Sequence, residues 1–295
     1  MLREYLGGEL KLSTRTLSRL KHNEKGILLN GQRVTVRAVL QCGDTLSLAL
    51  EDGDGDTNPD IVPSEIPLDI LYEDEDTVAV NKPSGMATHP SYNHRTDTLA
   101  NALVYYFEKQ NRPFVFRAVN RLDIEASGIV LAAKSKNAAY RYNTAMRRGL
   151  IEKSYTAILR GTLPEQSGRL ESYISRLREG VVIRCSRESG ADSEYALTEY
   201  SVSETAGGFT LVSAVPVTGR THQLRVHFSS AGCPILGDTM YGGESPYIPR
   251  TALHSSKISF DRLSDGKRIS LSSELPEDMK KVWEMIRCQT ASAQK

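Results

Sequence analysis

Residues 120–135 read NRLDIEASGIVLAAKS, a polar loop that runs directly into an apolar stretch. A short apolar run bounded by polar residues predicts a buried β-strand, here at 127–135. Asp123 is therefore expected in a loop that feeds this strand, and loops fixed on a sheet are where catalytic side chains concentrate. An aspartate at such a place is also common as a turn or capping residue. The stretch alone leaves both interpretations open.

The segments around this strand alternate between strand and helix patterns. Acidic residues separate two apolar runs within 66–83, and Gly207-Gly208 divides a second strand pair within 198–219. Further strands are predicted at 152–161, 258–262 and 268–273, and helices at 98–110, 137–149, 221–232 and 275–288. Many strands with scattered helices indicate the α+β class, with a large mixed or antiparallel sheet flanked by helices.

A change in composition divides the chain. Residues 51–76 contain eleven Asp and Glu and no Lys or Arg, whereas 1–50 carry a net charge of +4 and 77–295 one of +8. The segment 51–64 is expected to be an acidic linker, because 51–60 has no apolar residue to bury. Its Asp52, Asp54 and Asp56 resemble the start of a calcium loop, but Pro63 stands where the bidentate glutamate belongs. The larger unit is placed at 65–288 and a flexible tail at 289–295.

Residues 1–50 read as a small module of the α+β class. A basic helix near Leu17 and Leu20 breaks at Gly26, and Asn30-Gly31 then separates two β-rich runs, which is a strong hairpin signal. The helix carries Arg15, Arg19 and Lys21. Clustered positive charge of this kind suits a polyanion and is also common on a solvated helix face.

Composition excludes several classes of protein. The 295 residues include four cysteines without a Cys-x-x-Cys pair, which argues against a structural zinc site or a disulfide framework. No apolar run has the length of a membrane span, and the first residues do not form a signal peptide. We therefore expect a cytoplasmic protein with reduced thiols. The motifs of P-loop, dinucleotide-binding, zinc-protease and serine-hydrolase sites are missing.

Two further stretches can carry chemistry. TGRTHQLRVH (218–227) predicts a short helix capped by Thr221, which could clamp phosphate or be a solvated basic helix. EKSYTAILRG (152–161) predicts a strand in which Lys153 and Tyr155 share a face. A tyrosine there could stack on a base, transfer a proton or simply fill the core.

Taken together and in order, these stretches resemble the RluA-type pseudouridine synthases. The family's His-Arg-Leu-Asp-x-x-Thr-Ser-Gly corresponds to Asn120–Gly128, its Lys-x-Tyr to Lys153–Tyr155, and its Gly-Arg-Thr-His-Gln-Leu-Arg-x-His to 219–227. The stretches at 81–86, 237–242 and 253–254 also fit, so the resemblance covers about 65–288. The module 1–50 resembles the small RNA-binding domain named after ribosomal protein S-four.

The resemblance implies isomerisation of uridine in RNA without a metal or an organic cofactor. The glycosidic bond breaks, the uracil rotates and a carbon–carbon bond to the ribose forms, after the base has flipped out of the stack. The implied catalytic residues are Asp123, Arg220 as the arginine that pairs with its carboxylate, and Tyr155 as the tyrosine that stacks on the base. Substrate or RNA contacts are assigned to Arg121, Asn120, Lys153, His222, Arg225 and Leu253, and to Arg15, Arg19 and Lys21 in the module.

Two positions depart from the family pattern, because Asn120 replaces its histidine and Ala126 its threonine. The expected function is a pseudouridine synthase for structured RNA, with large-subunit ribosomal RNA as the expected substrate and a monomer as the default state. The alternatives are a transfer-RNA synthase, an RNA-binding or ribosome-assembly factor with impaired catalysis, and a glycosidase for free nucleosides.

Overall fold

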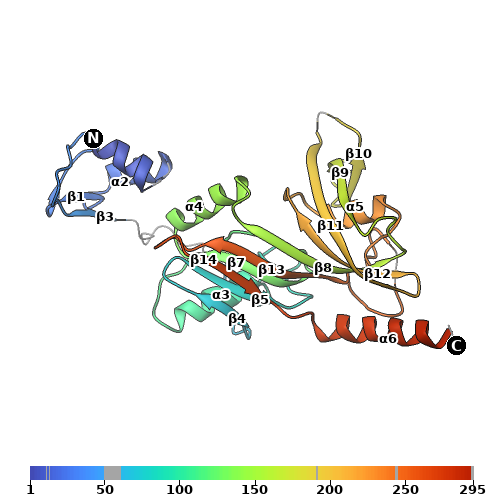
Figure 1. The fold of residues 1–295 in the computed structure, drawn as a ribbon. Coiled ribbons are helices and arrows are strands. Elements are labelled where there is room, and N and C mark those ends of the chain that lie inside the picture. The colour runs from blue at the N-terminus through green and yellow to red at the C-terminus, as the bar shows by residue number, and fades with distance from the viewer. Residues whose placement is uncertain (11, 13, 50–60, 191, 243–244, 294–295) are drawn as a thin grey trace.

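The computed structural model describes the chain except for residues 11, 13, 50–60, 191, 243–244 and 294–295. Figure 1 shows the small N-terminal unit at one end and the larger unit, built on one long sheet, beyond it. The helices are α1 (Leu2–Glu4), a π-helical turn (Tyr5–Glu9), α2 (Thr14–His22), α3 (Leu99–Glu108), α4 (Lys136–Arg147), α5 (Gln223–Ser230) and α6 (Glu277–Ala293). The strands are β1 (Ile27–Leu29), β2 (Gln32–Arg33), β3 (Leu46–Leu48), β4 (Ile70–Glu73), β5 (Thr77–Lys82), β6 (Arg117–Ala118), β7 (Ser127–Ala133), β8 (Glu152–Arg160), β9 (Ser167–Arg176), β10 (Arg184–Arg187), β11 (Glu194–Ala206), β12 (Phe209–Pro216), β13 (Leu253–Asp261) and β14 (Arg268–Ser272).

The larger unit is built on one mixed sheet of eleven strands. Its order is β10-β9-β11-β12-β8-β13-β7-β5-β4, with β14 paired to β13 and β6 to β7. Neighbouring strands are antiparallel except β13 and β7, which run parallel at His254 and Ser127. The α+β class with a large mixed sheet, as predicted, is confirmed.

Strands β5 and β7 are buried on both faces. Val80 and Val130 pack with α3 on one side of the sheet, while Ala79 and Leu131 pack with α4 on the other. Side chains alternate between the two faces of a strand, so both alternating sets must be apolar here. The continuous apolar run after Asp123 is explained by this double burial.

Gly128 allows β7 and β13 to approach each other closely. It has φ +110°, and a Cβ at this position would lie 2.3 Å from the carbonyl oxygen of Ser255. Beside it, the Ser127 hydroxyl lies 2.9 Å from His254 Nδ1. The loop that carries Asp123 therefore enters the sheet where backbone leaves no room for a side chain.

Strands β9 and β10 have no counterpart among the elements predicted from sequence. They form the edge of the sheet beside β11, and most of their residues are exposed or half-buried. In Figure 1 they rise from the sheet as an arm next to α5. A strand with so little buried surface has a weak apolar pattern, which explains the omission.

The N-terminal unit has its own core, formed by Leu2, Leu6, Leu12, Leu20 and Ile27. The predicted helix and hairpin are confirmed as α2 and as β1 paired to β2, with β3 on the other side of β1. The turns before α2, including the π-helical one, have no sequence prediction. They place Leu2 and Leu6 in the core.

The boundaries of the larger unit differ from those predicted. Ile61 is buried in its core, and Asn101 in α3 donates through Nδ2 to the carbonyl of Val62 at 2.7 Å. Residues 61–64 thus pack on the larger unit rather than serving as linker, while 51–60 lie outside the described residues. At the other end α6 continues to Ala293, into the segment predicted to be a flexible tail. Within the described part of the chain, no helix is both long and apolar enough to cross a membrane.

Candidate active site

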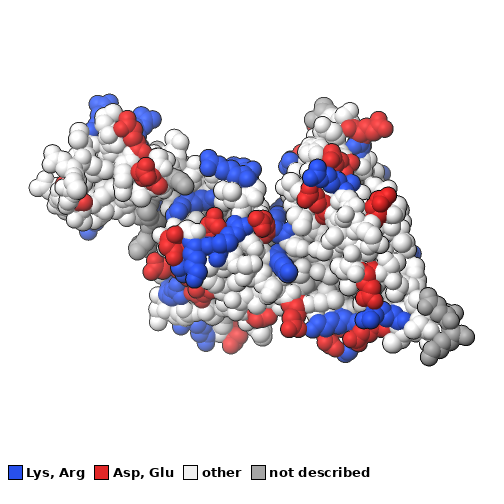
Figure 2. Space-filling model, in the orientation of Figure 1, with Lys and Arg blue, Asp and Glu red and all other residues white. Residues whose placement is uncertain are grey.

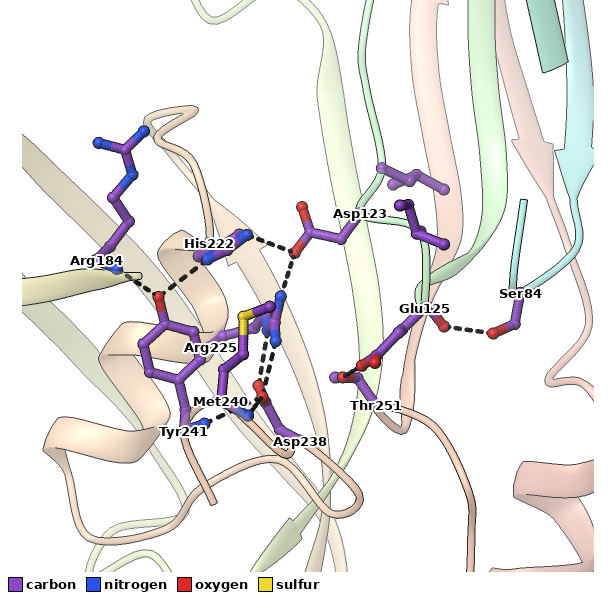
Figure 3. A network of polar contacts seen from close by, with 12 residues as sticks. Ser84, Asp123, Glu125, Arg184, His222, Arg225, Asp238, Met240, Tyr241 and Thr251 are labelled. Atoms are coloured by element: carbon purple, nitrogen blue, oxygen red, sulfur yellow. Dashed lines mark hydrogen bonds and ion pairs between the residues drawn. The ribbon is translucent and has the colours of Figure 1, made fainter. Parts of the chain in front are cut away.

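The loop that carries Asp123 is attached to the segment that follows β5. Gly85 N–H donates to the carbonyl of Ile124 at 2.8 Å, and the Ser84 hydroxyl donates to that of Glu125 at 2.6 Å. The Glu125 carboxylate in turn accepts from the hydroxyl of Thr251, ahead of β13. These contacts, part of which Figure 3 shows, fix the two residues after Asp123 from both sides. Asp123 itself keeps 31 % of its side chain exposed.

Lys82, at the end of β5, lies under this loop. It is fully buried and donates through Nζ to the carbonyls of Pro83 at 2.8 Å and Met86 at 2.7 Å. Burial lowers the pKa of Lys82 to about 7, although the negative charge of Asp123 acts in the opposite direction. A cationic group beneath the loop therefore adds to the field at Asp123 whenever Lys82 is protonated.

Arg225 pairs with Asp123. Its Nη1 lies 3.1 Å from Asp123 Oδ2, and Asp238 accepts from its Nε at 2.7 Å and from its Nη2 at 2.8 Å. The arginine and Asp238 are both buried. Burial alone would lower the pKa of Arg225, but the hydrogen bonds and charges of Asp238 and Asp123 raise it. A permanently charged guanidinium clamped in this way keeps an adjacent carboxylate ionised and oriented.

The predicted pairing of Arg220 with the Asp123 carboxylate is wrong. Arg220 precedes α5 and points to β11, where it donates to the carbonyl of Tyr195 at 3.0 Å and to the Glu194 carboxylate at 2.5 Å. The helix begins only after His222, so an arginine inside its first turn, Arg225, faces the loop instead. Thr221 is likewise not the cap, since the N-cap residue is His222.

His222 lies beside the same carboxylate. Its Nε2 is 3.8 Å from Asp123 Oδ2, and its Nδ1 is 2.9 Å from the hydroxyl of Tyr241. Burial lowers the pKa of His222, with Asp123 acting in the opposite direction. Figure 3 shows His222 and Arg225, both at the start of α5, meeting Asp123 on the loop before β7.

Tyr155 lies on β8, opposite Ser255 on β13, and is buried. Burial raises the pKa of Tyr155 to about 12, and the charge of Asp123 contributes in the same direction. Leu253, the first residue of β13, is buried in the same apolar cluster. Lys153 is half-buried, and its Nζ lies 4.0 Å from where a Cβ would stand on Gly219. The Lys-x-Tyr and Gly-Arg-Thr-His stretches therefore meet in space.

Asn120 does not reach a substrate surface. It is 6 % exposed, donates through Nδ2 to the carbonyl of Ile129 at 3.0 Å and accepts from the N–H of Leu131 at 2.8 Å. Both groups of its amide are thus used on the backbone of β7, which corrects its assignment as an RNA contact.

Arg121 is exposed and lies near His89. Burial lowers the pKa of His89, and the charge of Arg121 lowers it further.

The three residues of the N-terminal unit predicted to contact RNA, Arg15, Arg19 and Lys21, lie on α2. Lys21 is exposed and Arg19 is half-buried, whereas the Arg15 side chain lies outside the description. The 237–242 stretch, to which no role was assigned from sequence, supplies Asp238 and Tyr241 to the site. Among the described residues, no group of three or more His, Cys, Asp or Glu could hold a metal ion.

The arrangement is one partly exposed carboxylate, fixed by a buried cation and bordered by a histidine and a buried tyrosine. A carboxylate held in this way can act as a nucleophile or as a base.

Comparison with known proteins identifies the family. Residues 76–230, more than half of the chain, match the family model described as RNA pseudouridylate synthase. An uncharacterized RNA pseudouridine synthase of Bacillus subtilis is 33 % identical over 95 % of this chain and 97 % of its own. The large-subunit pseudouridine synthase D of Borreliella burgdorferi is 31 % identical over 87 % of this chain and 81 % of its own. Among solved structures, human RNA pseudouridylate synthase domain containing 4 is similar, with a TM-score of 0.61 and 25 % identity over 74 % of this chain and 93 % of its own. The chain belongs to the RNA pseudouridylate synthase family and is an RNA pseudouridine synthase, an isomerase.

Proposed function

We propose that this enzyme isomerises specific uridines of large-subunit ribosomal RNA through chemistry that depends on Asp123. The observation that carries the proposal is the buried Arg225, which is clamped by Asp238 and offers one N–H to Asp123 at 3.1 Å. The choice of RNA is supported by relatives named large-subunit pseudouridine synthases, at 30–31 % identity.

The reaction conserves all atoms of the nucleotide. The bond between ribose C1′ and uracil N1 breaks, the base turns, and C1′ bonds to C5, which releases its hydrogen while N1 gains one. Asp123 is proposed as the group that assists at the ribose or the base. Because the pKa of Tyr155 is raised to about 12, its phenol stays protonated near neutral pH, which favours stacking over proton abstraction.

Access to the glycosidic bond requires the uridine to leave the RNA stack. Arg121 is exposed two residues before Asp123, a position from which it can fill the space vacated by the flipped base. Figure 2 shows Lys and Arg side chains over α4, which carries Lys136, Arg141 and Arg147. We propose that this side of the larger unit accommodates the phosphates around the site.

The test is Asp123→Asn, which removes the carboxylate charge and preserves the shape. We expect no pseudouridine to form on a transcript of large-subunit ribosomal RNA, while affinity for that RNA stays within about twofold, because one half-exposed side chain adds little to phosphate-dominated binding. Asp97→Asn is the matched control and should remain active, since Asp97 pairs with His94 at the surface. Pseudouridine made by the Asp123→Asn protein would refute the proposal.

Mapping pseudouridine in cells with and without the protein identifies the substrate. The proposal expects a site in large-subunit ribosomal RNA to disappear on deletion. Loss of a transfer-RNA site would instead name the alternative substrate. If no site disappeared and the purified protein modified no transcript, a role in RNA binding or ribosome assembly would replace the proposed one.

The N-terminal unit is proposed as an additional RNA contact of the S-four-like type. Its basic helix α2 stands on a separate small core, so its charges can act independently of the active site. Deleting residues 1–50 should weaken RNA binding and flatten its dependence on salt, because fewer counterions are released. An unchanged slope of affinity against salt concentration would rule out this role.

A further inference from the structure

His222 adopts a backbone conformation that is rare for residues other than glycine. Its φ is 57°, in the left-handed region, and its side chain is only 8 % exposed. The turn is held by the buried side chain of Gln223, whose Oε1 accepts from the Thr218 hydroxyl at 2.7 Å and from Arg220 N–H at 3.0 Å. Such conformations persist where the surroundings determine them, and they concentrate at functional sites.

Tyr241 fixes the ring of His222 from the side opposite Asp123. The two rings meet edge to face with centroids 5.7 Å apart, and the phenol oxygen lies 2.9 Å from Nδ1. The same oxygen accepts from the backbone N–H of Arg184 at 2.7 Å. Because a backbone N–H can only donate, the phenol hydrogen remains available for Nδ1.

This arrangement selects one form of the imidazole. Burial lowers the pKa of His222, so the ring is neutral near neutral pH and carries a single hydrogen. If Nδ1 accepts from Tyr241, that hydrogen is on Nε2, which faces Asp123 Oδ2 at 3.8 Å. The other tautomer would direct a lone pair at the carboxylate, which is electrostatically unfavourable.

Both neighbours of the carboxylate contact the same oxygen. Arg225 Nη1 and His222 Nε2 approach Oδ2 of Asp123, so Oδ1 is the oxygen left uncommitted by them. Figure 3 shows the two side chains reaching Asp123 from the same side. A carboxylate with one oxygen fixed in this way presents the other toward the reacting nucleotide.

We propose that His222, oriented by Tyr241, is a positioning residue that holds the Asp123 carboxylate with Oδ1 directed at the substrate. The chain of hydrogen bonds runs from the Arg184 backbone through Tyr241 to His222, whose Nε2 then faces Asp123 Oδ2 at 3.8 Å. It therefore connects the edge strand β10 to the reacting group. The inference rests on the proposed role of Asp123.

Removal of the Tyr241 hydroxyl is the sharpest test. Tyr241→Phe keeps the ring that lies under Arg225, with 5.1 Å between the guanidinium carbon and the ring centre. We expect a roughly three- to tenfold lower rate constant for the bound RNA, the effect of losing one neutral hydrogen bond, while RNA affinity stays within about twofold. Tyr72→Phe, which removes a hydroxyl bonded to Asp74 in the β4–β5 turn, is the matched control and should retain the wild-type rate.

Variants of His222 itself complete the test. His222→Ala should slow the bound reaction roughly 10- to 100-fold, and His222→Gln should recover part of the rate, because its amide N–H can take the place of Nε2–H. If Tyr241 acts through His222, the double variant Tyr241→Phe/His222→Ala should be no slower than His222→Ala alone.

The assay is a single-turnover measurement with full-length protein in excess over a large-subunit ribosomal RNA transcript that is tritiated at uridine C5. Filter binding measures the RNA affinity. Unchanged rates in Tyr241→Phe and His222→Ala would overturn the inference. So would a loss of RNA affinity at an unchanged bound rate, since it would make His222 an RNA contact. Activity of Asp123→Asn in the same assay would instead refute the proposed function.

Discussion

Replacing Asp238 by asparagine removes one negative charge from a buried pair without changing the shape of the side chain. Asp238 is fully buried and accepts from Arg225 through both oxygens, and its Oδ1 also accepts from the N–H of Met240 at 3.1 Å. All of these partners are donors. The NH₂ group of an asparagine must therefore face another N–H group in either orientation, and the buried guanidinium loses its main counter-charge.

The expected loss of stability follows from this geometry. Removing one partner of a buried ion pair costs about 3–5 kcal/mol. Arg225 keeps a second partner, Asp123, through one hydrogen bond at 3.1 Å, so the lower end of about 3 kcal/mol is expected. At about 2–4 °C for each kcal/mol in a domain of this size, the melting temperature should fall by about 6–12 °C.

Thermal unfolding followed by circular dichroism measures this change. The control is Asp265→Asn, which removes the charge of an exposed partner of Arg262 and should leave the melting temperature close to that of wild type. The bound reaction rate should also fall in Asp238→Asn, because Arg225 is no longer fixed against Asp123. A melting temperature equal to that of wild type would refute the reasoning, because the Arg225–Asp238 pair would then contribute nothing to the fold.

Gly128→Ala should destabilise the enzyme by at least about 3 kcal/mol in urea unfolding, because the new Cβ would lie 2.3 Å from the Ser255 carbonyl oxygen at φ +110°; wild-type stability would contradict the close approach. Asn120→Ala should cost about 1–3 kcal/mol in the same assay, since it leaves a buried carbonyl and a buried N–H of β7 without their partner. Lys82→Met should flatten the pH dependence of stability between about pH 7 and 10.5. The pKa of Lys82 is about 7 in the folded protein, against 10.5 as the ordinary value. In that window the unfolded chain binds a proton that the folded protein releases, so wild-type stability gains from rising pH. Lys267→Met, at an exposed lysine, should keep the wild-type slope, and an equally steep slope in Lys82→Met would contradict the shifted pKa.

The sequence predicts strands that are buried on both faces better than strands that bury little. Strands β5 and β7 are buried on both faces, so their apolar runs are unambiguous. Strands β9 and β10 bury little, and no apolar pattern marks them. The helix predicted at 221–232 is found at 223–230, and its first six residues, Gln223–Phe228, are all buried, which excludes the solvated basic helix that was one of the two interpretations. Contacts with β9, β10 and β11 cover it, and these depend on an arm that the sequence does not reveal.

In the site, too, the sequence predicts some residues and not others. Arg220 and Arg225 lie in one motif, and spacing alone cannot tell which of them faces Asp123. The left-handed backbone of His222 decides which arginine faces Asp123, because the helix begins after His222 and therefore includes Arg225 but not Arg220. Asp238, which completes the clamp, comes from a Gly-bounded turn with no chemical signal of its own. Asp123 could be predicted because its stretch is one of several that together match the family. Which residues hold its carboxylate, Arg225 and Asp238, depends on tertiary geometry and could not be told from sequence.

The two departures from the family pattern, Asn120 and Ala126, lie among the residues that attach the Asp123 loop to the sheet. Asn120 uses its amide oxygen and nitrogen on the backbone of β7, and Ala126 is 2 % exposed with its N–H donating to the Asp123 carbonyl at 3.2 Å. Neither position faces the exposed side of the loop, so a change there affects how the loop is attached to β7. An asparagine amide combines an N–H donor with a carbonyl acceptor, which are what the two backbone groups of β7 require. The groups proposed to act on the substrate, Asp123 with its Arg225 clamp and Tyr155, are the ones that match the family. The departures therefore favour a difference in how the loop is supported over a loss of the chemistry.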